Sequence, residues 1–302
     1  MSSSYQFKWE KWHCPICGPG EEKFLGYRGG KYHRNNLGLT STMVACKACD
    51  LIYSNPFPVP QNLAELYSNP EDYFSGYASE EKVAACKNAL TIAKKFVPHL
   101  ETAKLLDIGA GCGELVYAAQ SMGLQMDGLE FSKPMIEQAK NKFQVILHQE
   151  SAENWALKNK ANYDLVYLNA VLEHLHQPQK MIEAVRILLK PNGILFIEVP
   201  KEPYLHIRLL HLWEKLKGSE RVFYLSPTWP PFHVYGFNHK SIKTLLKKYD
   251  FEILETKSYS SMNLPNITGW KKHFVLAAFK LVTWITNLLG DAPNLTVWAK
   301  LK

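Results

Sequence analysis

The sequence lacks a hydrophobic run long enough to cross a membrane. Its most apolar late stretch, residues 274–289, is interrupted by Lys280 and falls short of the roughly 20 apolar residues that span a bilayer. Residues 1–12 mix Ser, Lys and Glu without an apolar centre, which argues against a secretory signal. We therefore expect no transmembrane segment and a cytoplasmic location.

Charge of one sign is not concentrated anywhere either. The 302 residues carry a formal net charge of +7, with Lys and Arg scattered along the chain, which is typical of a slightly basic, solvated surface. A hydrophobic content of 46% and a charged content of 21% exclude wholesale disorder. The length allows one full α/β domain and a smaller unit, since single domains usually have about 100–200 residues.

Cysteines are few, but four of the six stand in two close pairs. The pairs are Cys14-Pro-Ile-Cys17 and Cys46-Lys-Ala-Cys49. Each pair can present two thiolates to one tetrahedral Zn²⁺, so together they supply the four ligands of a closed, structural site. Without an export signal the spacing favours a metal over disulfides, and a redox dithiol would need only one pair. We predict a structural Zn²⁺ site and a reducing compartment.

Short apolar strands alternate with helical segments from Lys104 onward, which predicts right-handed βαβ units and a parallel sheet. A helix over 270–289 separates the last two strands, so the sheet is expected to end in an antiparallel pair. We thus predict an α/β fold with a mostly parallel, seven-stranded sheet whose last strand is antiparallel. The expected strands are 104–108, 126–130, 144–148, 164–169, 193–199, 251–259 and 295–299.

The strongest local signal is a glycine-rich turn between the first of these strands and the following helix. It reads Asp107-Ile-Gly-Ala-Gly-Cys-Gly113, and its glycines allow a tight turn and the close approach of a ligand. The next strand ends at Glu130, whose carboxylate can accept hydrogen bonds from both hydroxyls of a ribose. The third glycine comes one residue too early for a nicotinamide cofactor. A nucleotide-like ligand other than NAD is favoured.

These motifs, with Gly128-Leu-Glu-Phe-Ser132 and the segments 163–174 and 189–200, resemble class I S-adenosylmethionine-dependent methyltransferases over about residues 104–200. The resemblance implies a Rossmann-like fold and S-adenosylmethionine as cofactor. It places Glu130 on the ribose, Ser151 and Ala152 beside the adenine, and the backbone of Asn169 near the methionine moiety. The implied cofactor-binding residues are Asp107, Gly109, Gly111, Gly113, Glu130, Phe131, Ser151, Ala152 and Asn169.

The domain organisation follows from the same patterns. A zinc-binding module is expected over 1–60, a helical linker or lid over 61–100, and the Rossmann-like methyltransferase domain over 101–302. Insertions into that domain are expected at 204–238 and 262–290.

Methyl transfer is an in-line displacement, so the enzyme must aim the acceptor and, for a hydroxyl, remove a proton. The candidate bases are His233 and His174, since neutral imidazole is available near neutral pH. His233 is preferred because the segment before the next helix commonly covers the acceptor pocket in this family. Each histidine can alternatively be a lid or core residue.

Tyr77 is a candidate residue lining the acceptor pocket, or it packs the linker against the domain. Phe232 stands where related sugar C-methyltransferases have Glu, which favours O- or N-methylation.

Two stretches combine many apolar residues with basic ones. Residues 205–217 alternate apolar with basic positions, and 270–289 are apolar nearly all round. Either can touch a membrane or a lipid-linked acceptor; the alternatives are capping a pocket or forming an oligomer contact.

Three functions remain open at this point. The first is methylation of a small-molecule acceptor: a sugar, a polysaccharide precursor or a secondary-metabolite intermediate. The second is an RNA or protein methyltransferase guided by the zinc module, although few Lys or Arg are interleaved with the aromatics after that module, which disfavours nucleic acid. The third is a scaffold without turnover, against which the intact glycine turn and Glu130 argue.

Overall fold

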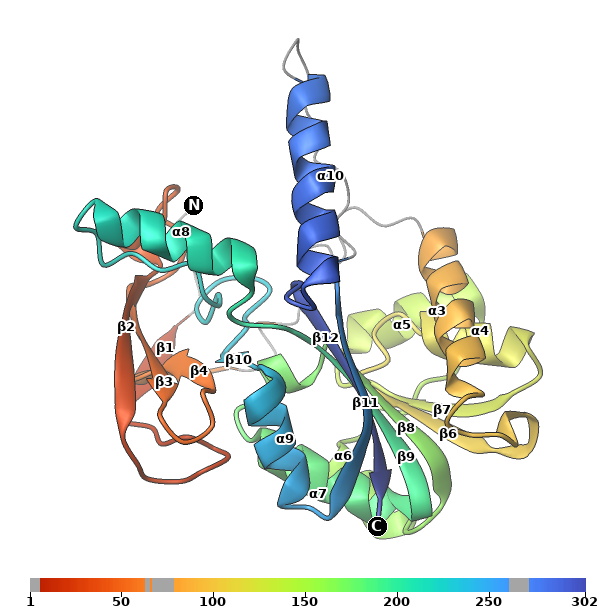
Figure 1. Ribbon diagram of the computed structural model, residues 1–302. Coiled ribbons are helices and arrows are strands. Elements are labelled where there is room, and N and C mark those ends of the chain that lie inside the picture. Colours follow the sequence, from red (N-terminus) through yellow and green to blue (C-terminus); the bar gives the residue numbers. More distant parts are fainter. Residues whose placement is uncertain (1–5, 63–65, 67–78, 261–271) are drawn as a thin grey trace.

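The computed structural model describes residues 6–62, 66, 79–260 and 272–302. Tyr77, one of the sequence-predicted site residues, lies outside them. A large sheet flanked by helices forms one part of the molecule, and a smaller all-β part precedes it in the chain (Figure 1).

The large sheet has six strands in the order β11-β12-β9-β8-β6-β7. Neighbours among β6, β7, β8 and β9 are parallel, whereas β12 runs antiparallel to both β9 and β11. The predicted mostly parallel sheet with an antiparallel last strand is confirmed. The strands are β6 (Lys104–Ile108), β7 (Gln125–Leu129), β8 (Tyr163–Asn169), β9 (Leu189–Pro200), β11 (Phe251–Tyr259) and β12 (Asn294–Leu301).

The strand expected at 144–148 does not form, which leaves six strands in the described part of this sheet instead of seven. Gln144 has a left-handed backbone with φ 57°, and the segment after it meets β7 in a single bridge between His148 and Leu129. Leu147 is buried while Ile146 is 77% exposed. Buried and exposed side chains therefore do alternate in this segment, as in a strand. The alternation arises because one side of the segment packs against the edge of the sheet, without a ladder of hydrogen bonds.

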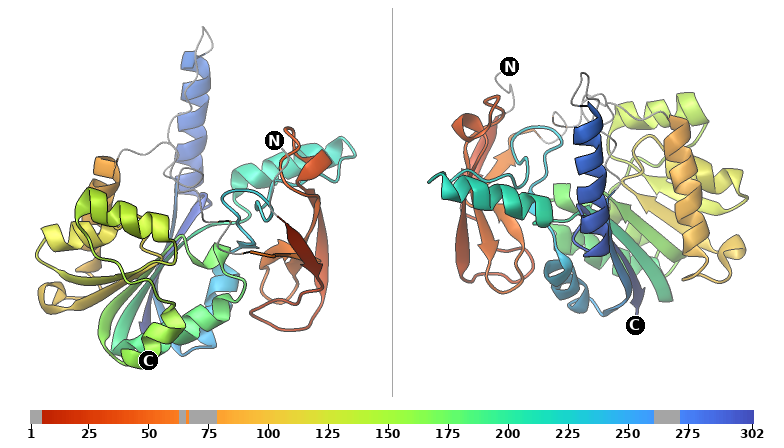
Figure 2. Two further views of the ribbon diagram at one scale, coloured as in Figure 1. Left: turned by 180° about the vertical axis from the view of Figure 1, so that it is seen from behind. Right: turned by 45° about the horizontal axis from the view of Figure 1, so that its top comes forward.

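Helices cover both faces of the large sheet, as its alternating side chains require. Leu105 of β6 packs with α3, α4 and α5 on one face, and Leu106 packs with α6, α7 and α9 on the other; Figure 2 shows both layers from behind. The helices are α3 (Ser79–Ala93), α4 (Glu114–Ser121), α5 (Lys133–Phe143), α6 (Ala152–Lys158), α7 (Pro178–Leu188) and α9 (His239–Lys247), with single 3₁₀ turns η1 (Gly30–Tyr32), η2 (Leu100–Thr102) and η3 (Leu172–His174).

The smaller part is built from two antiparallel sheets, β1-β5 and β10-β4-β3-β2. Its fourth strand, β10 (Tyr235–Gly236), comes from far along the chain and pairs with β4, so Tyr235 lies opposite Tyr53. The segment between β9 and α9 thus ties the two parts together. The remaining strands are β1 (Phe7–Glu10), β2 (Glu22–Arg28), β3 (Ser41–Cys46), β4 (Ile52–Ser54) and β5 (Phe57–Pro60).

Two helices stand away from these layers, α8 (Leu205–Leu216) and α10 (Lys272–Leu288). Helix α8 follows β9, and α10 connects β11 to β12 and projects from the sheet (Figures 1 and 2). Both therefore leave the edge of the sheet at which β9 ends. Among the described residues, no helix is long and apolar enough to span a bilayer.

Candidate active site and cysteine cluster

The glycine turn joins β6 to α4 with three left-handed residues. The φ angles are 75° at Gly109, 56° at Gly111 and 79° at Gly113, which glycine adopts at no steric cost. A Cβ on Gly109 would lie only 2.7 Å from Cγ2 of Val171. Glycine is therefore required here both by the backbone and by the close approach of the segment after β8.

Glu130 ties this turn to the end of β7. Its carboxylate accepts hydrogen bonds from the backbone N–H of Gly111 at 2.8 Å, of Phe131 at 2.8 Å and of Ser132 at 2.7 Å. Burial raises the pKa of Glu130, and these backbone donors oppose that rise. A carboxylate so held still has lone pairs to accept hydrogen bonds from ribose hydroxyls.

Asp107 lies directly before the turn and is 4% exposed. Burial, with the nearby charges of Glu130 and Glu114, raises the pKa of Asp107 to about 7. A carboxyl group with this pKa is poised to hold or release a proton near neutrality, and a bound cation would favour its charged form.

The register of the parallel strands brings the other predicted cofactor residues to the same edge. Ile108 is level with Leu129 of β7 and Leu168 of β8, so Gly109, Glu130 and Asn169 leave three neighbouring strands side by side.

Ser151, Ala152 and Phe131 surround this edge in different ways. The Ser151 hydroxyl caps α6 by accepting a hydrogen bond from the Asn154 N–H at 3.2 Å, a role that Asp fills equally well. Ala152 is buried, and Phe131 is 58% exposed. The exposed Phe131 ring is available to cover a bound ligand.

His174 and His233 meet near the carboxyl edge of the sheet. Their ring centroids are 4.9 Å apart, with the rings at 68°. His174 belongs to η3, five residues after the end of β8, and His233 precedes β10. The sequence leaves the two histidines as alternative candidate bases, and the structure brings their rings together.

Glu173 is a third member of the group that sequence reasoning missed. It is fully buried, and within the described residues neither of its carboxylate oxygens has a hydrogen-bond partner. Its Oε1 lies 3.9 Å from Nε2 of His174, and ligand atoms of Glu173, His174 and His233 all fall within 4.8 Å of one another. Such a group can share a proton or hold a metal ion. The sequence signal that could have pointed to Glu173 is the Glu-His pair a few residues after the end of β8.

Burial makes all three groups favour their neutral forms. It raises the pKa of Glu173 to about 8 and lowers the pKa of His174 to about 4. Burial and then the neighbouring His174 lower the pKa of His233 to about 3. Near neutral pH the imidazoles are therefore uncharged and the Glu173 carboxyl is mostly protonated.

A pocket adjoins His174 and is lined by both parts of the molecule. Aromatic, proline and aliphatic side chains dominate its wall, with His176 as a second polar group. The lining residues are Phe7, Pro58, Pro60, Leu66, His174, His176, Pro227, Phe232 and Val234. Strands β1 and β5 of the smaller part thus help to close the candidate acceptor side.

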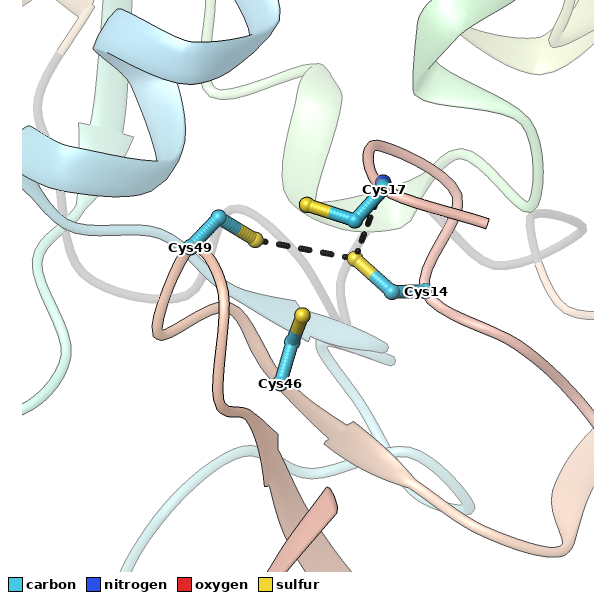
Figure 3. Close-up of side chains that lie close together, drawn as sticks. All are labelled: Cys14, Cys17, Cys46 and Cys49. Atoms are coloured by element: carbon cyan, nitrogen blue, oxygen red, sulfur yellow. Dashed lines mark hydrogen bonds between the residues drawn. The ribbon is translucent and has the colours of Figure 1, made fainter. Parts of the chain in front are cut away.

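The four paired cysteines converge in the smaller part (Figure 3). Sγ of Cys14 lies 3.6 Å from Sγ of Cys49, and the four sulfurs of Cys14, Cys17, Cys46 and Cys49 lie within 4.8 Å of one another. Each pair sits in a tight turn, since the Gly18 N–H donates to the Cys14 carbonyl and the Asp50 N–H to the Cys46 carbonyl, both at 2.8 Å. The cluster fits a tetrahedral metal ion.

The thiols do not titrate alike. A hydrogen bond with Cys49 is the main cause that lowers the pKa of Cys14 to about 6, whereas burial raises the pKa of Cys17 to about 11. A cation at the centre would stabilise all four thiolates together, which is why metal binding and proton release are coupled at such sites.

Residues 77–256 match the model of the methyltransferase domain family. The chain is 33% identical over 103 residues to a ubiquinone biosynthesis O-methyltransferase of Paraburkholderia xenovorans, covering 32% of this chain and 44% of that protein. It is 34% identical over 98 residues to a protein of the same name from Klebsiella pneumoniae, covering 31% and 40%. The match thus spans less than half the length of these curated relatives.

Among solved structures, a SAM-dependent methyltransferase from Archaeoglobus fulgidus aligns with a TM-score of 0.49 and 17% identity, covering 71% of this chain and 94% of that one. The family match covers more than half of the chain. The chain belongs to the methyltransferase domain family.

Proposed function

We propose that this enzyme methylates an oxygen or nitrogen of a small-molecule acceptor such as a sugar, a polysaccharide precursor or a secondary-metabolite intermediate. The observation that carries the proposal is the group formed by the buried Glu173 and the partly buried His174 and His233 at the carboxyl edge of the sheet, beside a pocket. The names of the relatives, which are O-methyltransferases, support oxygen as the methylated atom.

The cofactor is proposed to lie across the ends of β6, β7 and β8. Glu130 would accept hydrogen bonds from the ribose, the glycines at 109, 111 and 113 would let the backbone approach, and Ala152 and Phe131 would border the adenine. Bound S-adenosylmethionine supplies a methyl group on a positively charged sulfonium. Asp107, buried beneath the glycine turn with a raised pKa, would become more acidic beside that positive charge.

His233 is proposed as the group that accepts the acceptor's proton, with His174 as the alternative. The neutral imidazole of His233 offers a lone pair for that proton, and the rings of His233 and His174 are adjacent. When bound, S-adenosylmethionine would bring a positive sulfonium charge to this edge, and methyl transfer would exchange that charge for the one on the imidazolium. The site is then not left with additional buried charge, which would be costly.

The lining of the pocket supports a small acceptor over RNA. No Lys or Arg is among its lining residues, whereas proteins that hold nucleic acid place several cations along the backbone. Methylation of RNA or protein remains the alternative hypothesis.

The cysteine cluster is proposed to hold one structural Zn²⁺. Three of its four cysteines are buried, so no coordination position is open for a substrate. We propose 1–60 as the zinc-binding module, 61–100 as a helical linker or lid, and 101–302 as the catalytic domain. Thiolates that must stay reduced also support a cytoplasmic location.

The test is a screen of hydroxylated and aminated small molecules, with formation of S-adenosylhomocysteine as the readout. Any hit is repeated with His233→Ala, Glu173→Gln and the control His99→Ala, an exposed residue before β6. We expect the first two variants to lose about 10²-fold or more in kcat and the control to be unchanged. Turnover on RNA alone would contradict the proposal, as would a second bound metal that Glu173→Gln removes.

A further inference from the structure

Helix α8 exposes an apolar stripe along its whole length. Leu205, Leu209, Leu212 and Leu216 follow one another at helical spacing, and the last three are 55%, 56% and 75% exposed. Trp213 borders the stripe and is 58% exposed. The helix has no buried residue, so this stripe faces away from the rest of the molecule.

Basic residues flank the stripe on both sides. At 100° per residue, Arg208 and Lys215 lie along one border of the leucines, and Lys217, just after the helix, lies along the other. The only acidic residue of α8 is Glu214, whose side chain is 14% exposed and whose carboxylate lies 3.3 Å from Nζ of Lys217. An apolar stripe with Trp and with cations on both borders is the pattern of a helix that lies in a bilayer interface.

Helix α10 presents a second apolar stripe. Leu281, Trp284 and Leu288 are 56%, 61% and 69% exposed and stand three and four residues apart, so they share one side of the helix. Leu289 extends the stripe and is 62% exposed.

The two helices meet at Asp291. This residue accepts hydrogen bonds from Lys201, just before α8, and from Arg208 within it, and its carbonyl accepts from the Leu205 N–H. The base of α10 and the start of α8 are thereby fixed to each other where β9 ends, which is the edge that carries Asn169 and Glu130 (Figure 1).

We propose that α8 and α10 form a surface that binds anionic lipid bilayers and brings the active-site edge of the sheet to the membrane. The apolar stripes enter the interface, and Lys215 attracts the lipid headgroups, together with Arg208 and Lys217, which also form ion pairs with Asp291 and Glu214. A second copy of the chain is the less favoured occupant, because it would bring a partner that also carries a net charge of +7 against this basic surface. This inference does not rest on the proposed acceptor, since binding is measured without turnover.

The experiment is flotation of the full chain with vesicles of phosphatidylcholine alone or with 30% phosphatidylglycerol, at low and high salt. We expect binding to the anionic vesicles that salt weakens. The double variants Leu212→Glu/Leu216→Glu and Trp284→Glu/Leu288→Glu should each bind about tenfold more weakly or worse. The matched control is Leu157→Glu, which changes an equally exposed leucine (72%) on α6.

Circular dichroism and binding of S-adenosylmethionine show whether each variant is folded, and sedimentation without lipid shows its oligomeric state. Absence of wild-type binding to anionic vesicles overturns the proposal. Equal binding by the double variants and the control also overturns it. A dimer in buffer that only the double variants abolish, without vesicle binding, identifies a second copy as the occupant instead.

Discussion

Replacing Glu130 by Gln tests the proposed role of its carboxylate in cofactor binding, because the two side chains have nearly the same volume. In the wild type one oxygen accepts from Gly111, and the other accepts from both Phe131 and Ser132. A Gln side chain of the same shape has one oxygen, so its NH₂ group must face a backbone N–H. The best arrangement keeps the two donors of Phe131 and Ser132 and turns the NH₂ toward Gly111, which detaches the glycine turn.

The cost follows from the hydrogen bonds lost. Removing a charged acceptor from one backbone donor costs about 1.5–3 kcal/mol, and the amide also accepts less well from the ribose hydroxyls. We expect the Kd for S-adenosylmethionine to rise by about 10²-fold, since about 1.4 kcal/mol corresponds to a factor of ten.

Calorimetric titration measures this Kd, with thermal unfolding recorded in parallel without cofactor. Glu137→Gln, an exposed residue on α5, is the control and should bind as the wild type does. A Kd for Glu130→Gln within threefold of the wild type would refute the assignment of Glu130 to the cofactor.

Three further predictions concern the histidines and the cysteines. His233→Ala should lower kcat by about 10²-fold, measured in stopped-time assays, and leave the Kd for S-adenosylmethionine unchanged, measured by calorimetry. An equal loss of turnover and of cofactor affinity would indicate a structural role. Cys46→Ser should reduce bound zinc, measured by elemental analysis, and lower the unfolding temperature, whereas Cys86→Ser should retain zinc. Because the pKa values of His174 and His233 are lowered to about 4 and about 3, both imidazoles are neutral in the folded chain. Their contribution to the free energy of unfolding is then fully present above pH 6.5 and is lost as the pH falls toward 4. Denaturant titrations from pH 7 to 4 measure this loss in the wild type and in the double variant His174→Ala/His233→Ala. An equal loss of stability in both proteins would contradict the prediction.

Local sequence signals were sufficient for the first strand of the large sheet and the glycine turn after it. The strand at 104–108 and the glycines after it are specified by neighbouring residues, and the structure has the strand with the same bounds. The antiparallel pairing of the last two strands could also be predicted, because a helix between them leaves room for an antiparallel return.

Features that depend on distant contacts could not be predicted in this way. The pairing of Tyr235 with Tyr53 joins segments far apart in the sequence, and no local pattern marks a two-residue strand. His174 lies close to His233 because the Val234 N–H donates to the Glu173 carbonyl at 2.8 Å, which is another contact between segments far apart in the sequence. The failed strand at 144–148 shows the converse, since alternating burial at an edge looks the same in sequence whether or not a ladder forms.

The most direct test of the central claim is calorimetric titration of the purified chain with S-adenosylmethionine and, separately, with NADH. The cofactor site at the ends of β6, β7 and β8 predicts binding of S-adenosylmethionine with a Kd on the order of micromolar and no heat with NADH. Binding of NADH, or no binding of S-adenosylmethionine to the folded protein, would contradict the account.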